Sequence, residues 1–315
     1  MSEFHRPILL KEVNKHLLIK LGEKYIDATI GGGGHTKEIL KLGGKVLGID
    51  CDPEAIKAAR KSLQACPTPR RAKRALRGST SSWQLIQDEA MYRLVRGNFA
   101  HLKKIGQENG FSRVGGVLFD LGVSSYQLET PQRGFSFSLE APLDMRMDSN
   151  LEVTAADLVN GLNRGELEKL FAKYGEETDS RRIATAICQA RQTKKIETTQ
   201  ELAKIIVGVK PRREKFGRIH PATRCFQALR IAVNDELNNL REALPQALTL
   251  LKHGGRLVVI SFHSGEDRIV KQFLKEAERK SEMNILTKKP VRPSQEEINQ
   301  NPRSRSAKLR AGEKI

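Results

Sequence analysis

The chain has 315 residues, of which 38% are hydrophobic and 29% charged, and its 55 Lys and Arg against 37 Asp and Glu give a formal charge of +18. This length and composition suffice for an ordinary core, which argues against global disorder and suggests about two domains. No apolar run approaches the roughly 20 residues that cross a bilayer. The N-terminus also lacks the basic-then-apolar order of a secretory signal, so we expect a cytoplasmic protein that does not span a membrane.

The cysteines are scattered along the chain and form no CxxC pair. Such a spacing offers neither a disulfide framework nor the paired ligands of a structural zinc site. We therefore expect no metal. The four positions are Cys51, Cys66, Cys188 and Cys225.

The positive charge is concentrated in three segments, 60–78, 191–224 and 288–314, which carry net charges of +7, +7 and +5. The rest of the chain is close to neutral, which is the distribution expected of a nucleic-acid-binding protein. Solvated loops and tails are the alternative interpretation of each basic run. An anionic membrane surface is a weaker candidate, because no amphipathic anchor accompanies the charges.

Short apolar runs in the first part of the chain end in turn-prone or acidic residues, and the segment between the first two has helical character. Strands that alternate with helices indicate βαβ units and a parallel sheet. The predicted strands are Lys24–Ala28, Lys45–Ile49, Arg93–Arg96 and Val114–Phe119, and the predicted helix between the first two is His35–Leu42.

A fifth apolar run, Arg256–Phe262, comes only after a long interval and follows a segment, Asn234–Lys252, whose leucines keep helical spacing. The interval is too long for a single loop. It contains a capping-box pattern, Thr198 to Glu201, before the last of several helical segments. We infer a helical domain inserted between the fourth and fifth strands. Its predicted helices are Ala155–Leu162, Arg164–Tyr174, Ser180–Gln192 and Thr199–Val207.

The predicted organisation is therefore a discontinuous doubly wound α/β domain, residues 1–140 and 216–315, which encloses a helical domain at 141–215. A basic loop at about 64–91 is rich in Pro, Ser and Thr and reads as a surface addition. The tail from Lys288 is rich in Pro, Asn and Arg, and we expect docking on the body or on a partner to order it.

The strongest local signal is a glycine-rich loop, Gly31–Gly34, between the first strand and a helix. Glycines let the backbone approach a ligand, and the helix N-terminus offers free N–H groups. Asp50 ends the second strand and is placed to accept hydrogen bonds from a ribose. An adenosine-type ligand is favoured over a tight turn without a ligand. NAD is the competitor, but Thr36 replaces the third glycine of its fingerprint, and Asp27 before the loop suits a sulfonium or amino-acid group better than pyrophosphate.

Asp120 closes the fourth strand, at the edge of the sheet where ligands and chemistry gather in doubly wound folds. Phe135 and Phe137 follow, either as core residues at strand spacing or as rings that stack on an extruded base. Polar clusters around His220 and His263 are more typical of structural than of catalytic histidines. No Ser-His-Asp order or HExxH motif supports a hydrolase.

With these features in place, the sequence closely resembles the bacterial 16S ribosomal RNA cytosine-N4-methyltransferases (RsmH family). The resemblance covers nearly the whole chain from His5, and several of its motifs exceed six residues. Besides the Gly-rich loop, the matching motifs are DLGVSSYQL (120–128), RGFSF (133–137), PLDMRMD (142–148), HPATRCFQALRIAVNDEL (220–237), SFHSGEDR (261–268) and NPRSRSAKLR (301–310).

The resemblance implies a class I methyltransferase fold with an inserted helical domain, S-adenosylmethionine as methyl donor without a metal, and one cytosine in the decoding region of 16S rRNA as target, within the small ribosomal subunit. It leaves a homodimer and the assembly stage of the substrate open. A cytosine amine needs an acceptor near its N–H groups, and the candidates are Asp120, as the catalytic residue, or the carbonyls just after it. By motif position, the donor-contacting residues would be Gly33, Gly34, His35, Asp50, Phe99, Asp120 and Gln127.

The sequence departs from the family pattern between Asp50 and Phe99, where it is longer by roughly 25 residues, which we assign to about Gln64–Met91. The donor motifs are intact, so only an extra RNA contact by this loop is in question. Asp120-Leu-Gly-Val stands where many amino-directed DNA methyltransferases have a DPPY-like tetrapeptide. Asp120 could therefore serve either the amine or mainly the donor. The residues themselves indicate a nucleic-acid methyltransferase, with a methyltransferase on another nucleic acid and a non-catalytic RNA-binding assembly factor as the alternatives.

Overall fold

The computed structural model describes residues 7–64, 91–211 and 220–315, and the chain divides into two compact units. The first comprises Met1–Gly122 and Leu237–Ile315, and the second Val123–Glu236. These boundaries differ from the predicted 140 and 216, because the buried core of the second unit includes Phe135 and the helix α13 (Thr223–Asn234). Nearly all of the predicted basic loop at about 64–91 lies outside the described residues.

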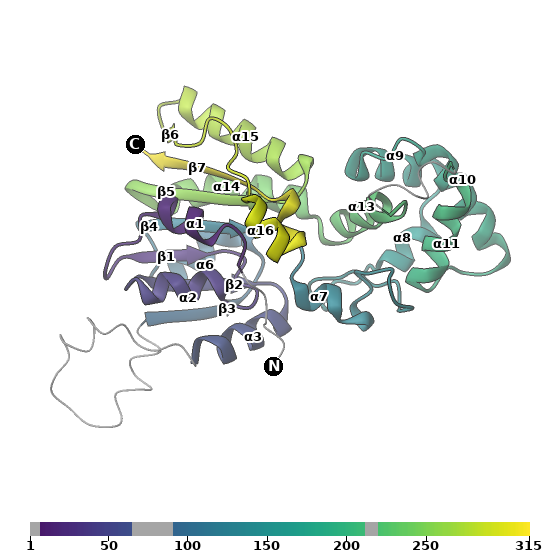
Figure 1. Ribbon diagram of the computed structural model, residues 1–315, viewed down its shortest axis with the longest axis horizontal. Coiled ribbons are helices and arrows are strands. Elements are labelled where there is room, and N and C mark those ends of the chain that lie inside the picture. Colours follow the sequence, from purple (N-terminus) through teal and green to yellow (C-terminus); the bar gives the residue numbers. More distant parts are fainter. Residues whose placement is uncertain (1–6, 65–90, 212–219) are drawn as a thin grey trace. The chain divides into compact units, whose positions relative to one another are not determined.

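The first unit is built on a seven-stranded sheet with the order β3-β2-β1-β4-β5-β7-β6 (Figure 1). Its first five strands are parallel, and β7 pairs antiparallel with both β5 and β6. This order and these directions are those of the class I methyltransferase fold, so the predicted fold class is confirmed. The strands are β1 (Lys24–Asp27), β2 (Lys45–Asp50), β3 (Tyr92–Arg96), β4 (Val114–Asp120), β5 (Leu251–Ser261), β6 (Met283–Ile285) and β7 (Lys308–Lys314).

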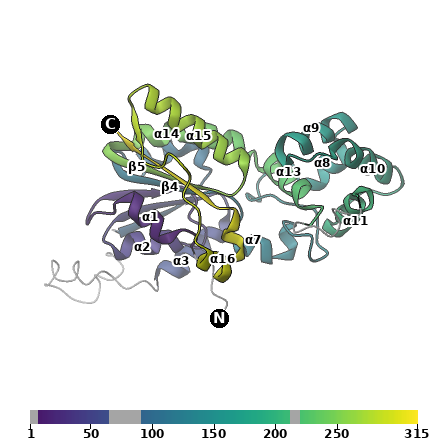
Figure 2. The same ribbon diagram turned by 45° about the horizontal axis from the view of Figure 1, so that its top comes forward.

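Helices lie on both faces of this sheet, as the two views show (Figures 1 and 2). One face buries Leu309 and Ala311 of β7 against a cluster that includes α1 and α2. On the other face Arg310 of β7 pairs with Asp267 of α15. The helices of this unit are α1 (Leu10–Leu17), α2 (Gly34–Lys41), α3 (Pro53–Gln64), α6 (Leu102–Glu108), α14 (Glu236–Leu250), α15 (Ser264–Arg279) and α16 (Gln295–Gln300), with 3-10 turns η1 (Phe99–His101) and η3 (Pro302–Ser306).

The predicted parallel strands are confirmed, but β5 begins at Leu251, before the predicted start at Arg256. Leu251 already pairs with Val114, and the register then shifts around exposed His253 and Gly254, which masks the strand in the sequence pattern. β6 and β7 were not predicted. They belong to the basic tail, which is ordered by docking on the body, since β7 inserts between β5 and β6.

The second unit is helical, and its predicted helices are confirmed within a residue or two. Capping boxes begin several of them, including the one predicted at Thr198 and Glu201. No helix in the described part of the chain is long and apolar enough to cross a membrane. The elements are α7 (Ser125–Glu129), η2 (Pro131–Arg133), α8 (Ala155–Gly161), α9 (Arg164–Gly175), α10 (Ser180–Thr193), α11 (Thr199–Val209) and α13 (Thr223–Asn234).

Candidate active site

The glycine loop joins the end of β1 to the start of α2. Gly31 and Gly33 have φ of +50° and +80°, in the left-handed region that glycine adopts without strain. A side chain on Gly34 would meet the Pro7 ring at 3.2 Å. The loop therefore presents bare backbone at the N-terminus of α2, as the sequence predicted for a site that a ligand approaches closely.

Asp50 ties the end of β2 to this loop. Its Oδ2 accepts a hydrogen bond from Gly31 N at 2.9 Å, and its Oδ1 accepts one from Asp52 N at 3.0 Å. Burial raises the pKa of Asp50 to about 6, because desolvation outweighs these two backbone hydrogen bonds. Each carboxylate oxygen keeps a second lone pair, so the residue is still able to accept hydrogen bonds from a diol.

Asp120 ends β4 beside the loop and faces His35, the second residue of α2. The two atoms His35 Nε2 and Asp120 Oδ2 are 3.4 Å apart, an ion-pair distance, and the side chains are only 6% and 12% exposed. Asp120 Oδ1 and His35 Nδ1 are buried without a hydrogen-bond partner among the described residues. The backbone N–H of Asp120 donates to Thr29 Oγ1 at 2.6 Å, which fixes the end of β4 against the loop.

Asp27 ends β1 near His35 and Asp120, and it is 1% exposed. Its Oδ2 lies 2.7 Å from Thr36 Oγ1 in a hydrogen bond, and Thr29 N donates more weakly to Oδ1 at 3.4 Å. Burial raises the pKa of Asp27, and the hydrogen bond from Thr36 and the charge of His35 only partly oppose it. Asp27, His35 and Asp120 thus form one buried group of ionisable side chains.

Phe99 follows β3 at the start of η1, and its ring meets Phe119 edge to face with centroids 5.7 Å apart. The turn before it is held to β2, because Gly97 N donates to Asp50 O at 2.9 Å. The structure therefore gathers six of the predicted site residues at one edge of the sheet in the first unit. They are Gly33, Gly34, His35, Asp50, Phe99 and Asp120.

Gln127 belongs to the second unit, within α7. It is 5% exposed, and its side-chain oxygen accepts a hydrogen bond from Ser124 N at 2.9 Å while Ser124 Oγ accepts one from Gln127 N. The residue thereby closes the capping box of α7. Its predicted contact with the donor stays a prediction.

The two phenylalanines after η2 differ in their surroundings. Phe135 is buried in the core of the second unit, which agrees with its interpretation as a core residue. Phe137 is partly buried, stacks on His220 with ring centroids 4.4 Å apart and also makes an edge-to-face pair with Phe226. The His220 imidazole therefore packs against an aromatic ring of its own unit.

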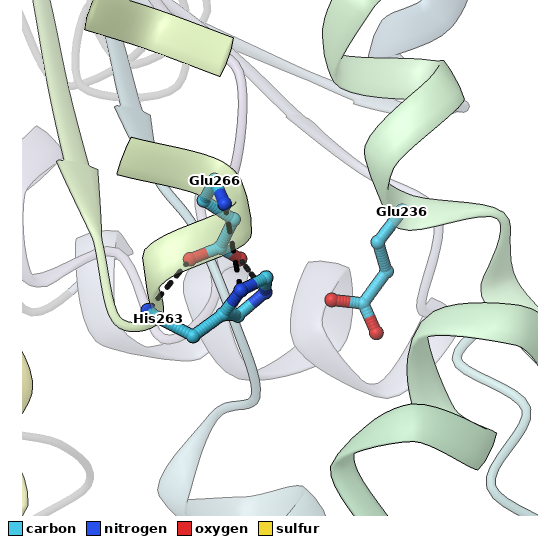
Figure 3. Close-up of side chains that lie close together, drawn as sticks. All are labelled: Glu236, His263 and Glu266. Carbon is cyan, nitrogen blue, oxygen red and sulfur yellow. Dashed lines mark hydrogen bonds and ion pairs between the residues drawn. The ribbon is translucent and has the colours of Figure 1, made fainter. Parts of the chain in front are cut away.

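His263 has the structural role that its sequence context favoured. It is the N-cap of α15, where its Nδ1 accepts a hydrogen bond from Glu266 N, and Glu266 in turn accepts from the backbone N–H of His263 (Figure 3). Its Nε2 lies 3.2 Å from Glu266 Oε1. Glu236, also drawn in Figure 3, is held by Arg230 through two hydrogen bonds of 2.7 and 2.8 Å.

Sequence reasoning missed the two threonines of the site. In the sequence pattern, Thr36 is only the residue that replaces the third glycine of the NAD fingerprint. In the structure its hydroxyl donates a hydrogen bond to Asp27. Thr29 was not considered, because its contact with Asp120 depends on β1 and β4 being neighbours in the sheet, which the local sequence does not reveal.

The residues at this edge fit S-adenosylmethionine. Bare glycine backbone and the acidic group of Asp50 are what an adenosine ligand requires, and Asp120 Oδ1 beside them is unpartnered among the described residues. An unsatisfied buried carboxylate oxygen is costly, so its presence indicates a group that reaches it during function.

Comparisons with known proteins give a consistent picture along the whole chain. The model of the MraW methylase family matches residues 2–315. The chain is 45% identical over 313 residues to the ribosomal RNA small subunit methyltransferase H of Persephonella marina, covering 99% of each chain. A protein of the same name from Trichlorobacter lovleyi is 43% identical over 334 residues, and the match covers 100% of both chains.

Solved structures align with the chain at lower similarity. An rRNA methylase from Streptococcus thermophilus aligns with a TM-score of 0.43 and 11% identity, covering 100% of this chain and 99% of that one. TrmN from Thermus thermophilus aligns with a TM-score of 0.42 and 12% identity, covering 98% of this chain and 48% of the other.

Proposed function

The chain belongs to the MraW methylase family, and on that premise we propose that it transfers a methyl group from S-adenosylmethionine to N4 of one cytosine in the decoding region of 16S rRNA. The observation that carries the proposal is the buried Asp120 Oδ1, which has no partner among the residues described and lies beside the glycine loop. The small-subunit rRNA comes from the names of the full-length relatives, and the N4 atom from the resemblance of the motifs.

The donor is assigned to the edge of the sheet formed by β1, β2 and β4. Gly33, Gly34 and His35 supply the loop, Asp50 accepts hydrogen bonds from the ribose hydroxyls, and Phe99 lines the same edge. When bound, S-adenosylmethionine supplies a methyl group on a positively charged sulfur, so the leaving group is already activated.

Asp120 is assigned to the amine. The exocyclic amine of cytosine is a poor nucleophile, because its lone pair is delocalised into the ring. A carboxylate that accepts a hydrogen bond from this amine favours the reactive form and receives the proton that transfer releases. The buried, unpartnered Oδ1 is suited to this role, since its acceptor capacity is not used elsewhere in the described structure.

The RNA is assigned to the helical second unit and to the basic C-terminal segment, in the cytoplasm where ribosomal subunits form. An amine within paired RNA must be exposed before transfer, either in an open region or by extrusion of the base. Arg303 and Arg305 lie on η3 immediately before β7 and are exposed, at the same edge of the sheet as the end of β5. The basic cluster Arg212, Arg213 and Lys215, a further candidate, lies outside the described residues.

The test is a methyl-transfer assay with labelled S-adenosylmethionine, which offers 16S RNA, 30S particles and DNA and identifies the product by nucleoside mass spectrometry. We expect N4-methylcytidine only from the RNA or the particle, and the preferred form gives the assembly stage. With Asp120→Asn, transfer should fall by at least about a hundredfold while RNA binding persists. Donor binding without any transfer by the wild type would support the assembly-factor alternative instead.

A further inference from the structure

His35 is a buried histidine whose surroundings differ from those of a structural histidine. It is 6% exposed, and neither ring nitrogen has a hydrogen-bond partner in the described structure. Asp120 Oδ2 lies 3.4 Å from its Nε2. His263 differs at its Nδ1, which accepts a hydrogen bond at the N-cap of α15, although its Nε2 is likewise buried without one and lies 3.2 Å from Glu266 Oε1. Burial of an unbonded polar ring is unfavourable, so the position of His35 calls for a role beyond packing.

Among the described residues, the charges that act most strongly on His35 are acidic. They come from three elements: Asp120 on β4, Asp27 on β1 and Glu297 on α16. Burial alone would lower the pKa of His35, but the pairing with Asp120 and the other two acids outweighs it, so the pKa is raised. Burial also raises the pKa of Asp27. A cation at His35 beside the carboxylate of Asp120 is an ion pair in a low dielectric, where pairing offsets the cost of burying each charge.

We propose that His35 is a positioning residue for methyl transfer, whose imidazolium is the buried counter-ion of Asp120 and occupies Oδ2 so that Oδ1 alone faces the reacting amine. The proposal rests on the proposed function and deepens it. An adjacent cation stabilises a buried carboxylate in the ionised form that accepts hydrogen bonds, and His35 supplies that cation here. Thr29 completes the arrangement, because its hydroxyl holds the backbone of Asp120.

The transfer step balances with these groups. A bond forms between N4 and the methyl carbon as the carbon–sulfur bond breaks, and the pair of electrons from that bond neutralises the sulfonium to a thioether. One N4 proton leaves and is accepted at Asp120 Oδ1. His35 keeps its own proton throughout, so its contribution is electrostatic and is made before the step begins.

The test is the pH dependence of methyl transfer by His35→Gln, which keeps a neutral hydrogen-bond donor but removes the charge. Without its counter-ion Asp120 is protonated more easily, so the acid limb of kcat/KM should move to higher pH. The variant should therefore be slower than the wild type on the acid side of the profile and approach it on the alkaline side. His253→Gln, at an exposed position on the opposite end of β5, is the matched control and should leave the profile unchanged.

A second measurement does not depend on activity. In protein with ¹⁵N-labelled histidine, NMR titration should show the pKa of the His35 ring above its ordinary value of 6.5, and Asp120→Asn should lower that pKa. A profile of His35→Gln that runs parallel to the wild type at all pH values, or a His35 pKa that Asp120→Asn leaves unchanged, would overturn the proposal. Absence of methyl transfer by the wild type would overturn the proposed function instead, and the NMR result would still stand.

Discussion

Two kinds of buried ionisable side chain occur in this protein, and their partners distinguish them. In the second unit Lys210 is 3% exposed and pairs with Glu177 and Asp179 at 2.5 and 3.2 Å, so its charge is compensated within the fold. In the first unit, His35 is the basic partner of Asp120 among the described residues, whereas Asp27 and Asp50 accept hydrogen bonds from uncharged groups. Groups whose charge the fold itself leaves uncompensated mark the site, because a ligand or substrate completes them.

The titration of Asp50 predicts a pH dependence of donor binding. Its pKa is raised to about 6, so the carboxylate is ionised above that pH and protonated below it. A protonated Asp50 loses acceptor capacity toward a ribose. The affinity for S-adenosylhomocysteine should therefore fall as the pH decreases from 7 to 5, by up to about tenfold per unit below the pKa. Calorimetric titration across this range measures it. In Asp50→Ala the residual affinity should lack this dependence, and a wild-type affinity that is constant down to pH 5 would contradict the prediction.

The Lys210 network predicts a large change in stability. Lys210→Met removes the cation and leaves Glu177, whose side chain is fully buried, without that partner. Such a loss costs about 3–5 kcal/mol of unfolding free energy. Urea denaturation measures it, and adding Glu177→Gln should recover part of the loss. Lys194→Met is the control, since that lysine pairs with Glu201 on the surface, and its effect should be small. Equal effects of the two lysine variants would show that the buried pair does not stabilise the fold.

At the scale of single residues, the sequence predicted the members of the site better than their contacts. Gly33, Asp50 and Asp120 follow strands in a recognisable order, so their gathering at one edge could be foreseen. The pairing of His35 with Asp120 could not, because it depends on which strands are neighbours and on the direction of one imidazole ring.

Among the elements, helices with a strong capping signal were predicted most accurately. The Thr198–Glu201 box closes in the structure as the sequence pattern implied. The strands β6 and β7 escaped prediction, because their short apolar alternation is interrupted by charges such as Lys308 and Arg310. Those charges are satisfied by tertiary contacts with Asp267 of α15, which a local pattern does not report.

Replacement of glycine by alanine should change stability in opposite directions at two positions of the second unit. Gly134 has φ of +70°, and an added Cβ would lie 2.3 Å from Pro142 O and 2.7 Å from Asp144 N. Gly134→Ala should cost about 2–4 kcal/mol, because both the backbone conformation and the space are unsuitable. Gly161 ends α8 with open space around it, so Gly161→Ala should stabilise by about 0.4–1 kcal/mol. Thermal unfolding of the two variants decides it, and a neutral Gly134→Ala would show that the turn adapts.

For the molecule as a whole, the charge of +18 predicts RNA binding that depends strongly on salt. Replacing Arg303 and Arg305 by Gln should weaken binding to 16S RNA and reduce the slope of log K against log salt by about one per arginine. Affinity for S-adenosylhomocysteine should not change. The control is Lys20→Gln with Arg113→Gln, two exposed positions that precede β1 and β4 at the opposite edge of the sheet. Equal loss of slope in both double variants would indicate a diffuse charge effect without a defined clamp.

The pairing of β4 with β5 has a consequence for how the chain folds. Asp120 ends β4 and Leu251 begins β5, so these parallel neighbours meet only after the intervening segment has been drawn together. Closing so long a loop is entropically slow, whereas the helices between them make local contacts around their own core. We therefore expect the inserted helices to collapse first and to shorten the effective loop, and the sheet to close late. The carboxylate of Asp120, at the end of β4, should therefore reach its final position only when β5 pairs with β4.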